Sequence, residues 1–335
     1  MNYINKFRAE NKWIPDGFHF LGVEESKHRR ALLDKIYIFF REKGYSEVTP
    51  PGFDFTSSFS NYIASNEVDK ILKLKDSSGK DISPSFDLTL QVVKGLAGFT
   101  EEGLNQKVFY TGKIVKENYK QNTDRREIFQ VGAEILGHSN SNTFKMLFSH
   151  INDLVKEFNL KHKLTLILGN VKVIKSLLSK FEFDREESSH FAKLLYQKDL
   201  PSLKDYMKNR NINSNIQDLI SELTLSFDLK NSHKILRDLT NKLNLDLDKF
   251  LIETEDLSEF SSKLDSIDFC IDYSLVSDLD YYTGFLFQGY YENISYPIFM
   301  GGAYDHLFFK FANVEKNSCG FAFNLDNIEG IIRSE

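Results

Sequence analysis

Apolar residues recur with helical spacing in two long stretches of the chain. Residues 144–158 carry an apolar stripe that predicts an amphipathic helix. Residues 24–43 predict a second such helix, which Gly44 would end as a C-terminal cap. The apolar face of this second helix consists of Leu32, Leu33, Ile36, Phe39 and Phe40.

Runs of apolar and β-branched residues predict short strands on both sides of the helix at 144–158. Residues 48–55 predict one of them, and since Pro50 and Pro51 cannot donate to a ladder, it should lie at a sheet edge or an interface, where a homodimer could form. Residues 70–89 predict a hairpin around a Ser-Ser-Gly turn. Further strands are expected at 107–115 and 127–136, as part of an antiparallel meander, and at 164–168, 269–275, 285–290 and 319–324.

The stretch 171–263 differs from the rest of the chain. It is rich in Leu, Lys, Asn and Ser, and its periodicity is helical without strand-like alternation. We therefore predict a helical insertion at 171–263. The flanking parts, 1–170 and 264–335, should form one α+β domain in which an antiparallel sheet is flanked by helices, with the strands on either side of the insertion in one sheet.

The composition is that of a globular protein, because 41% of the 335 residues are hydrophobic and 27% are charged. No apolar run approaches the roughly 18 residues that cross a bilayer, and the start of the chain lacks the apolar stretch of a secretion signal. We expect no membrane association and a cytoplasmic location. The net charge of −6 argues against the broad basic face that binds nucleic acid, tRNA included.

The sequence lacks the common catalytic and cofactor motifs. It contains no GxxxxGK phosphate loop, no GxGxxG after a strand, no HExxH and no GxSxG. Cys270 and Cys319 are too few for a disulfide framework and are not spaced for zinc, and the eight histidines are scattered. We therefore expect no metal and no cofactor.

Several polar groups fall inside predicted strands. Gln130 and Glu134 are an even number of positions apart, so both point to one side of their strand and could converge on a ligand, although the spacing alone favours a solvated face. Tyr281 and Tyr282 offer flat apolar surface with hydroxyl tips that suit an imidazole ring. Core packing of both tyrosines is the alternative, since 14% of the residues are aromatic.

A second pair of polar residues lies in the run SFDLTLQ. Asp87 and Thr89 are two positions apart and so, as in a strand, share a face, where a carboxylate and a hydroxyl could take the ammonium group of an amino acid. An ordinary Asp beside a turn is equally consistent with the pattern. Gly301 and Gly302 would allow a sharp turn or a close backbone approach before Tyr304.

Together these runs resemble the catalytic domain of class II aminoacyl-tRNA synthetases, in its histidyl branch, over nearly the whole chain. PDGFHF at 15–20 and GYSEVTPPGFD at 44–54 resemble the first, dimer-forming signature. YTGKIVKEN at 110–118 with RREIFQVGAEILG at 125–137 resembles the second signature. SDLDYYTG at 277–284 resembles the histidine loop, and GGAYDHL at 301–307 with GFAFNLDNI at 320–328 resembles the third signature.

The resemblance implies a histidine-binding site at the matching positions. Asp87, Thr89 and Gln130 would face the amino group of histidine. Glu134 and Tyr282 would take the ring nitrogens, and Tyr281 would line the pocket.

The chain departs from the family where the synthetases carry arginines, because Lys116, Ser277 and Asn327 stand at those positions. Lysine keeps a charge without the planar fork of arginine, and serine and asparagine keep neither. Adenylate formation relies on such positive charge at the ATP phosphates and the carboxylate. The chain also stops soon after the third signature, so we expect no C-terminal anticodon-binding domain and no tRNA binding.

Both departures are typical of the synthetase-like regulatory subunits of ATP phosphoribosyltransferase. This resemblance implies a non-catalytic protein that pairs with a short-form catalytic subunit in a hetero-oligomer, activates it and lets L-histidine inhibit it in the first step of histidine biosynthesis. The alternatives are a truncated histidyl-tRNA synthetase or another amino-acid-activating ligase, and a scaffold that binds the transferase but no amino acid.

Overall fold

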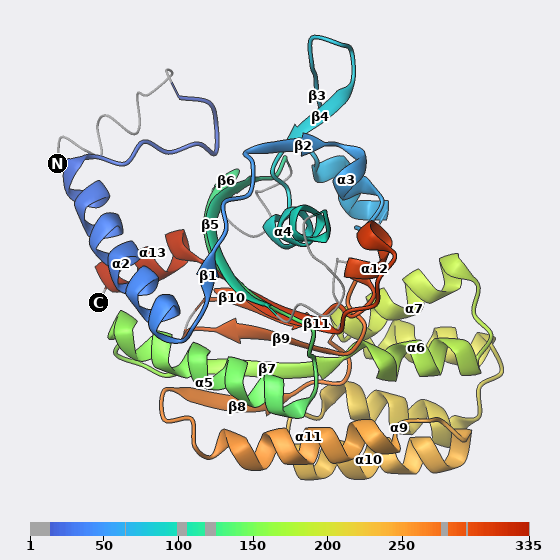
Figure 1. Ribbon diagram of the computed structural model, residues 1–335. Helices are drawn as coiled ribbons and strands as arrows, with labels where there is room; N and C mark the ends of the chain where they lie inside the picture. Colours follow the sequence, from blue (N-terminus) through green and yellow to red (C-terminus); the bar gives the residue numbers. More distant parts are fainter. Residues whose placement is uncertain are drawn as a thin grey trace, which may run out of the picture.

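The computed structural model describes residues 14–63, 65–98, 106–117, 125–275, 281–292 and 294–334. These residues form an eight-stranded curved sheet in the order β1-β5-β6-β11-β10-β9-β7-β8 (Figure 1). Neighbouring strands are antiparallel except in the two outer pairs, β1 with β5 and β7 with β8, which are parallel. The strands are β1 (Ser46–Glu47), β5 (Gln106–Val115), β6 (Glu127–Leu136), β7 (Leu164–Asn170), β8 (Ile267–Ile271), β9 (Phe285–Tyr290), β10 (Phe299–Ala303) and β11 (Ser318–Asn324).

The two faces of the sheet pack against different helices. Val131, Ala133 and Ile135 of β6 belong to a large core with the apolar stripes of α2 (Val23–Glu42) and α5 (Ser141–Phe158), the two predicted amphipathic helices. Gln130 and Glu134 point to the opposite face, where α4 (Leu88–Ala97) lies within the curve of the sheet (Figure 1). The alternation along β6 therefore separates the main core from a second, more polar layer.

A second sheet of three short strands, β2-β4-β3, corrects one prediction. Of the predicted strand at 48–55, only β2 (Phe53–Phe55) forms, and it pairs with β4 (Asp81–Pro84), whereas β1 precedes the predicted range and pairs with β5. Because Pro50 and Pro51 have no N–H to donate, the chain leaves the ladder between β1 and β2. The hairpin is confirmed as β3 (Leu74–Lys75) and β4, with Gly79 at φ +82° in its turn.

The residues between β7 and β8 are helical, as predicted. They form the crossover that a parallel strand pair requires, and β7 and β8 do lie in one sheet. The predicted strand at 269–275 ends earlier, at Ile271, because Asp272 accepts the backbone N–H of Ser274 and turns the chain. The helices are α6 (Val171–Lys180), α7 (Arg185–Gln197), α8 (Leu200–Asn209), α9 (Ser214–Leu225), α10 (Leu229–Leu243) and α11 (Asp248–Ser261).

Several elements near the second layer are absent from the sequence prediction. β10 is the most consequential, because Gly301 and Gly302 lie inside this strand and not in a turn. The two strands that follow β6 in the sheet, β11 and β10, also come from the end of the chain, so β5 and β6 form a hairpin and not a meander. The other unpredicted elements near this layer are α3 (Ser57–Ser60), η1 (Ser65–Lys70), α4 and α12 (Leu307–Ala312). The helix α13 (Leu325–Ser334) directly follows β11.

Neither cysteine forms a disulfide. Cys319 is buried and Cys270 is half-buried. In the described part of the chain, no helix is both long and apolar enough to cross a membrane.

Candidate amino-acid pocket

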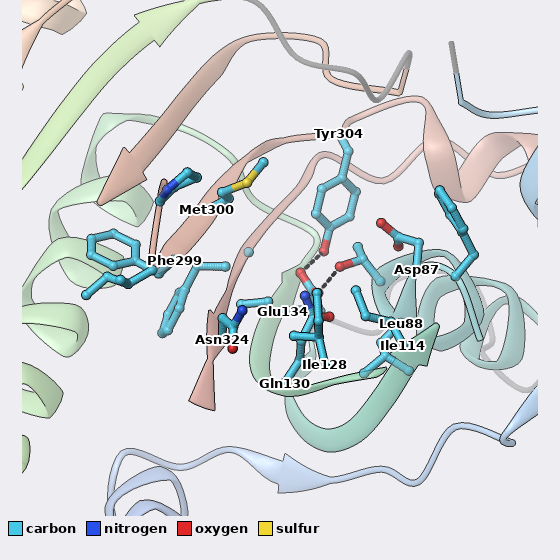
Figure 2. Close-up of a pocket in the computed structure, with 18 of the residues that line it drawn as sticks. Asp87, Leu88, Ile114, Ile128, Gln130, Glu134, Phe299, Met300, Tyr304 and Asn324 are labelled. Carbon is cyan, nitrogen blue, oxygen red and sulfur yellow. Dashed lines mark hydrogen bonds between the residues drawn. The ribbon is translucent and has the colours of Figure 1, made fainter. Parts of the chain in front are cut away.

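A cavity of about 200 Å³ opens on the layer between α4 and the sheet. Figure 2 shows Glu134 at its centre, with Gln130, Tyr304 and Asp87 around it and Phe299 and Met300 at the far end. All six candidate residues from the sequence line this cavity: Asp87, Thr89, Gln130, Glu134, Tyr281 and Tyr282. Its apolar walls come from Phe86, Leu88, Ile114, Ile128, Ile298, Phe299, Met300 and Phe321.

Glu134 accepts hydrogen bonds from three hydroxyl groups, each from a different element. Thr89 Oγ1 donates to its Oε1 over 2.8 Å, and the hydroxyl of Tyr110 on β5 donates to the same oxygen over 2.9 Å. The hydroxyl of Tyr304, just after β10, donates to Oε2 over 2.5 Å. The carboxyl group of Glu134 is thereby fixed in position before any ligand arrives.

The carboxyl group of Glu134 titrates near neutral pH. Its side chain is 1% exposed, and burial raises its pKa from 4.5 to about 7, although its hydroxyl partners favour the ionised form. A group of this kind can accept an N–H in one protonation state and donate a proton in the other. Both forms suit the ring of an imidazole.

Two glycines make room for this arrangement. Gly320 lies opposite Glu134 in the β6–β11 ladder, and a Cβ atom there would come within 1.6 Å of Glu134 Oε2. Gly132 lies opposite Tyr110, and a Cβ atom there would come within 2.3 Å of the Tyr110 ring. The side chains of Glu134 and Tyr110 therefore occupy the space that side chains at Gly320 and Gly132 would fill.

Asp87 and Thr89 reach the cavity from a helix and not from a strand, which corrects the interpretation of SFDLTLQ. Asp87 is the N-cap of α4, where its Oδ1 accepts the backbone N–H of Leu90 over 2.8 Å, and Thr89 lies in the first turn. The hydroxyl of Tyr281 donates to the other oxygen of Asp87 over 3.2 Å. Burial raises the pKa of Asp87, while the hydrogen bond from Leu90 and the charge of Lys116 act against the rise.

The two adjacent tyrosines are buried and in contact. The ring centres of Tyr281 and Tyr282 are 4.9 Å apart, and Tyr281 also meets the ring of Tyr304 edge to face. Gly302 of β10 gives Tyr282 its space, because a Cβ atom there would come within 2.6 Å of the ring. Burial raises the pKa of both tyrosines, so their hydroxyls stay neutral donors at physiological pH.

The positions that carry arginine in the synthetases are occupied differently here. Lys116 is the only lysine or arginine among the described residues that line the cavity, and its Nζ lies 4.9 Å from the centre of the Phe86 ring. Asn327 also lines it, and its buried Nδ2 has no hydrogen-bond partner. Ser277 lies outside the described residues. Within the described lining, a single cation faces an otherwise acidic and neutral set of groups.

Sequence reasoning missed two members of this site. Tyr110 was not singled out, although its pairing opposite Gly132 brings its hydroxyl to Glu134. Tyr304 was noted only as part of GGAYDHL. The segment around it is held by Asp305, which accepts hydrogen bonds from Thr283 Oγ1 over 3.0 Å and from the backbone N–H of Ser318 over 3.1 Å.

The chain is similar in sequence to known proteins. The family model described as Histidyl-tRNA synthetase matches residues 17–328. A protein of Leptospira interrogans named ATP phosphoribosyltransferase regulatory subunit is 42% identical over 97% of this chain and 95% of its own length. A protein of the same name from Lactococcus lactis is 26% identical over 95% of this chain and 94% of its own length.

Solved structures show the same fold. The crystal structure of an ATP phosphoribosyltransferase regulatory subunit/histidyl-tRNA synthetase from Bacillus halodurans matches with a TM-score of 0.81, at 19% identity, over 96% of this chain and 83% of that one. Histidyl-tRNA synthetase from Nostoc matches with a TM-score of 0.75, at 16% identity, over 97% of this chain and 76% of that one. The predicted class II synthetase-like fold is confirmed.

The expectation of a regulatory subunit, in place of an enzyme, agrees with the names of the relatives. The chain therefore belongs to the histidyl-tRNA synthetase family and, within it, to the ATP phosphoribosyltransferase regulatory subunits.

Proposed function

We propose that this chain activates a short-form catalytic subunit of ATP phosphoribosyltransferase and makes that enzyme sensitive to L-histidine, the end product of its pathway. The observation that carries the proposal is the pocket itself. Glu134 is held by three hydroxyl donors, yet Lys116 is the only cation among the described lining residues. Such a site suits binding of a small zwitterion without nucleotide chemistry, and it needs no cofactor.

Each part of histidine has a candidate partner in the cavity. Its ammonium group would meet the carboxylate of Asp87, with Thr89 and Gln130 beside it. Its ring nitrogens would meet Glu134 and Tyr282, and Tyr281 would pack against the ligand. Its carboxylate requires a cation, and Lys116 takes that role.

The same groups argue against amino-acid activation. Adenylate formation develops negative charge that must be stabilised by several positioned cations, and loss of one such group typically costs about 3 to 4 kcal/mol of transition-state stabilisation. Asn327 is neutral and lies at the position of one such arginine, and Lys116 lacks the bidentate geometry of another. A synthetase or ligase with this site would have only one described cation, Lys116, to stabilise that charge.

Inhibition by histidine then follows from linkage. A ligand shifts a conformational equilibrium only if it binds one arrangement more tightly than the other. Histidine must therefore bind the inhibited complex more tightly than the active complex. By reciprocity, the catalytic subunit in its active arrangement must weaken histidine binding by the same factor.

The direct test measures the rate of a short-form ATP phosphoribosyltransferase alone, with this chain, and with this chain plus histidine. We expect the chain to raise the rate and histidine to lower it again. Glu134→Gln should still activate but respond only to much higher histidine concentrations. The surface variant Glu24→Gln, on a residue whose side chain is 73% exposed, is the matched control.

The rival functions give different results. Histidine-dependent exchange of pyrophosphate into ATP by the pure chain would establish an activating enzyme and end the regulatory proposal. Activation without any response to histidine, together with a flat calorimetric titration of both the free chain and the complex, would establish a scaffold.

We further propose that the chain forms a homodimer inside the hetero-oligomer, through the groove beside β2. Phe53 is 52% exposed there, and Phe55 and Leu74 are also exposed. Exposed apolar surface of this kind commonly marks an interface. The groove is lined by Phe18, Pro50, Pro51, Phe53, Leu72, Leu74, Pro84 and Leu88, among others.

Sedimentation of the purified chain tests the dimer. Phe53→Glu should convert it to a monomer, because a carboxylate at the interface would lose its hydration without gaining a partner. Ile252→Glu changes an equally apolar side chain, 65% exposed on α11, and should leave the dimer intact. A wild-type chain that sediments as a monomer at all concentrations would contradict the proposal.

We expect no tRNA binding and a cytoplasmic location.

A further inference from the structure

Tyr281 and Tyr282 lie between β8 and β9, and residues 276–280 of this connection lie outside the described part of the chain. The described residues on either side of that gap, 272–275 and 281–284, are attached to the helices between β7 and β8. These attachments come from α6 and from the C-terminal end of α7.

The upstream attachment is the ammonium group of Lys198, the residue that ends α7. All three of its donors are used: Nζ donates to the carbonyl of Thr224 over 2.7 Å, to Asp272 Oδ2 over 3.0 Å and to Ser274 Oγ over 2.9 Å. Its side chain also lies 4.7 Å from the centre of the Phe227 ring. One side chain thus joins α7, the end of α9 and the turn that follows β8.

The turn that Lys198 contacts is organised around Asp272. Asp272 Oδ1 accepts the backbone N–H of Ser274 over 2.9 Å and its hydroxyl over 2.6 Å, while Oδ2 faces Lys198. The Asp272 side chain is only 8% exposed, so a carboxylate without its cation would be costly there. Lys198 itself has φ 54°, a left-handed conformation that is unusual for a residue with a side chain.

The downstream attachment involves α6. Lys175 Nζ donates to the backbone carbonyl of Tyr282 over 3.2 Å, and the N–H of Val171 donates to the carbonyl of Gly284 over 3.1 Å. Movement of α6 relative to the sheet would therefore act on the backbone at Tyr282 and Gly284.

We propose that Lys198 is a positioning residue for the amino-acid pocket, because it fixes the Asp272–Ser274 turn and so couples the helices α7 and α9 to Leu275, which follows that turn and lies in one buried apolar cluster with Tyr281 and Tyr282. The inference rests on the proposed function for the identity of the ligand. By reciprocity, if the contact of Lys198 raises the affinity of the pocket, an occupied pocket stabilises the contact. The contact between the helices and the Asp272–Ser274 turn is then more stable when histidine occupies the pocket.

The test compares Lys198→Met with Lys204→Met. Methionine keeps an unbranched apolar stem but removes the ammonium group. Lys204 also lies in this helical region and pairs with Asp218 at 3.3 Å, away from the pocket segment, so Lys204→Met is the matched control. Ser274→Ala removes a single partner of Lys198 and serves as a milder second variant if Lys198→Met does not fold.

Two measurements decide the outcome. The first is hydrogen exchange in the free chain at the amides of Leu275 and Thr283, which donate to Asp272 and Ala303, relative to amides of β6. We expect Lys198→Met to speed exchange at these two amides at least tenfold relative to β6, with no such change in Lys204→Met. The second is the dissociation constant for histidine by calorimetry, which should rise at least tenfold in Lys198→Met.

Unchanged relative exchange and unchanged affinity in Lys198→Met would overturn the inference, as would equal effects in both lysine variants. If the wild-type chain, free and in complex, binds no histidine, the proposed ligand is wrong, and the exchange measurement alone decides whether Lys198 positions the segment. The two failures are therefore distinguishable.

Discussion

Tyr304 donates its hydroxyl hydrogen to Oε2 of Glu134 over 2.5 Å, although 170 positions separate the two residues in the chain. Glu134 lies in β6 and Tyr304 directly follows β10, and β11 lies between these two strands. The bond can form only because Gly320, on the intervening strand, has no side chain in its path. The most specific contact of the pocket thus depends on three strands in register.

Glu134→Gln should change how stability depends on pH. The pKa of Glu134 is about 7 in the folded chain, against an ordinary value of 4.5, so the folded state holds the extra proton between these values. Stability therefore falls as pH rises through this window, by up to about 3 kcal/mol. We expect denaturant titrations at pH 5 and pH 8 to show that the stability of the wild type relative to Glu134→Gln falls between these two pH values.

Glu24→Gln, at an exposed side chain, should behave like the wild type in those titrations. An identical pH dependence in wild type and Glu134→Gln would mean that Glu134 ionises as it does in an unfolded chain.

His150→Phe should act on stability at acid pH. Nδ1 of His150 lies 3.0 Å from the hydroxyl of Tyr45, and burial lowers the pKa of the imidazole from 6.5 to about 4. The unfolded chain then binds more protons between these values, so this group makes stability fall as pH drops from 6.5 to 4, by up to about 3 kcal/mol. Thermal unfolding between pH 4.5 and 7 should be less acid-sensitive in His150→Phe, and a variant as acid-sensitive as wild type would refute this.

Gly320→Ala should destabilise the chain and weaken the pocket. The new Cβ atom would lie 1.6 Å from Glu134 Oε2 and 2.5 Å from the carbonyl oxygen of Ala133, and backbone cannot move aside as a side chain can. Overpacking of this kind typically costs about 1–3 kcal/mol. The free energy of unfolding measures the effect.

Gly330→Ala is the matched control for that substitution. Gly330 lies in α13, nothing lies within 4 Å of the position of its added Cβ atom, and alanine is the better helix former by about 1 kcal/mol. We expect this variant to be as stable as the wild type or more so. Equal destabilisation by both substitutions would remove the role assigned to Gly320.

Lys116→Met should lower histidine affinity by about tenfold or more, since a hydrogen bond between charged groups is typically worth about 1.5–3 kcal/mol and about 1.4 kcal/mol is a tenfold change in affinity. It removes the only cation among the described lining residues. Lys193→Met, at an exposed position of α7, provides the comparison. Calorimetric titration with histidine measures both, and unchanged affinity in Lys116→Met would show that another group holds the ligand carboxylate.

Runs of apolar residues located some strands to the residue. The predicted strands 127–136 and 285–290 coincide with β6 and β9, and most positions of both strands are buried or half-buried. The same signal failed at β10, where Gly301 and Gly302 were compatible with a turn. Only contacts with neighbouring strands show why these positions lack side chains.

The α4 error had a usable signal in the sequence. Asp87 precedes the apolar positions Leu88, Val92 and Val93, which is the pattern of an N-cap followed by a helix. The two-residue spacing of Asp87 and Thr89 was instead interpreted as a strand face. Both residues still reach the cavity, because a helix N-terminus and its first turn also point toward a common neighbour.

The sequence alone determined the periodic elements, the family resemblance and the residue types at the pocket, because these depend on local spacing and on motifs of adjacent residues. It did not determine which hydroxyls would surround Glu134. Tyr110 and Tyr304 became its partners through the strand order β5-β6-β11-β10 and through the pairing of side chains with glycines on neighbouring strands. The pattern within one strand shows which of its faces is buried, but it does not name the distant strand that will pair with it, and that pairing arises only in the folded sheet.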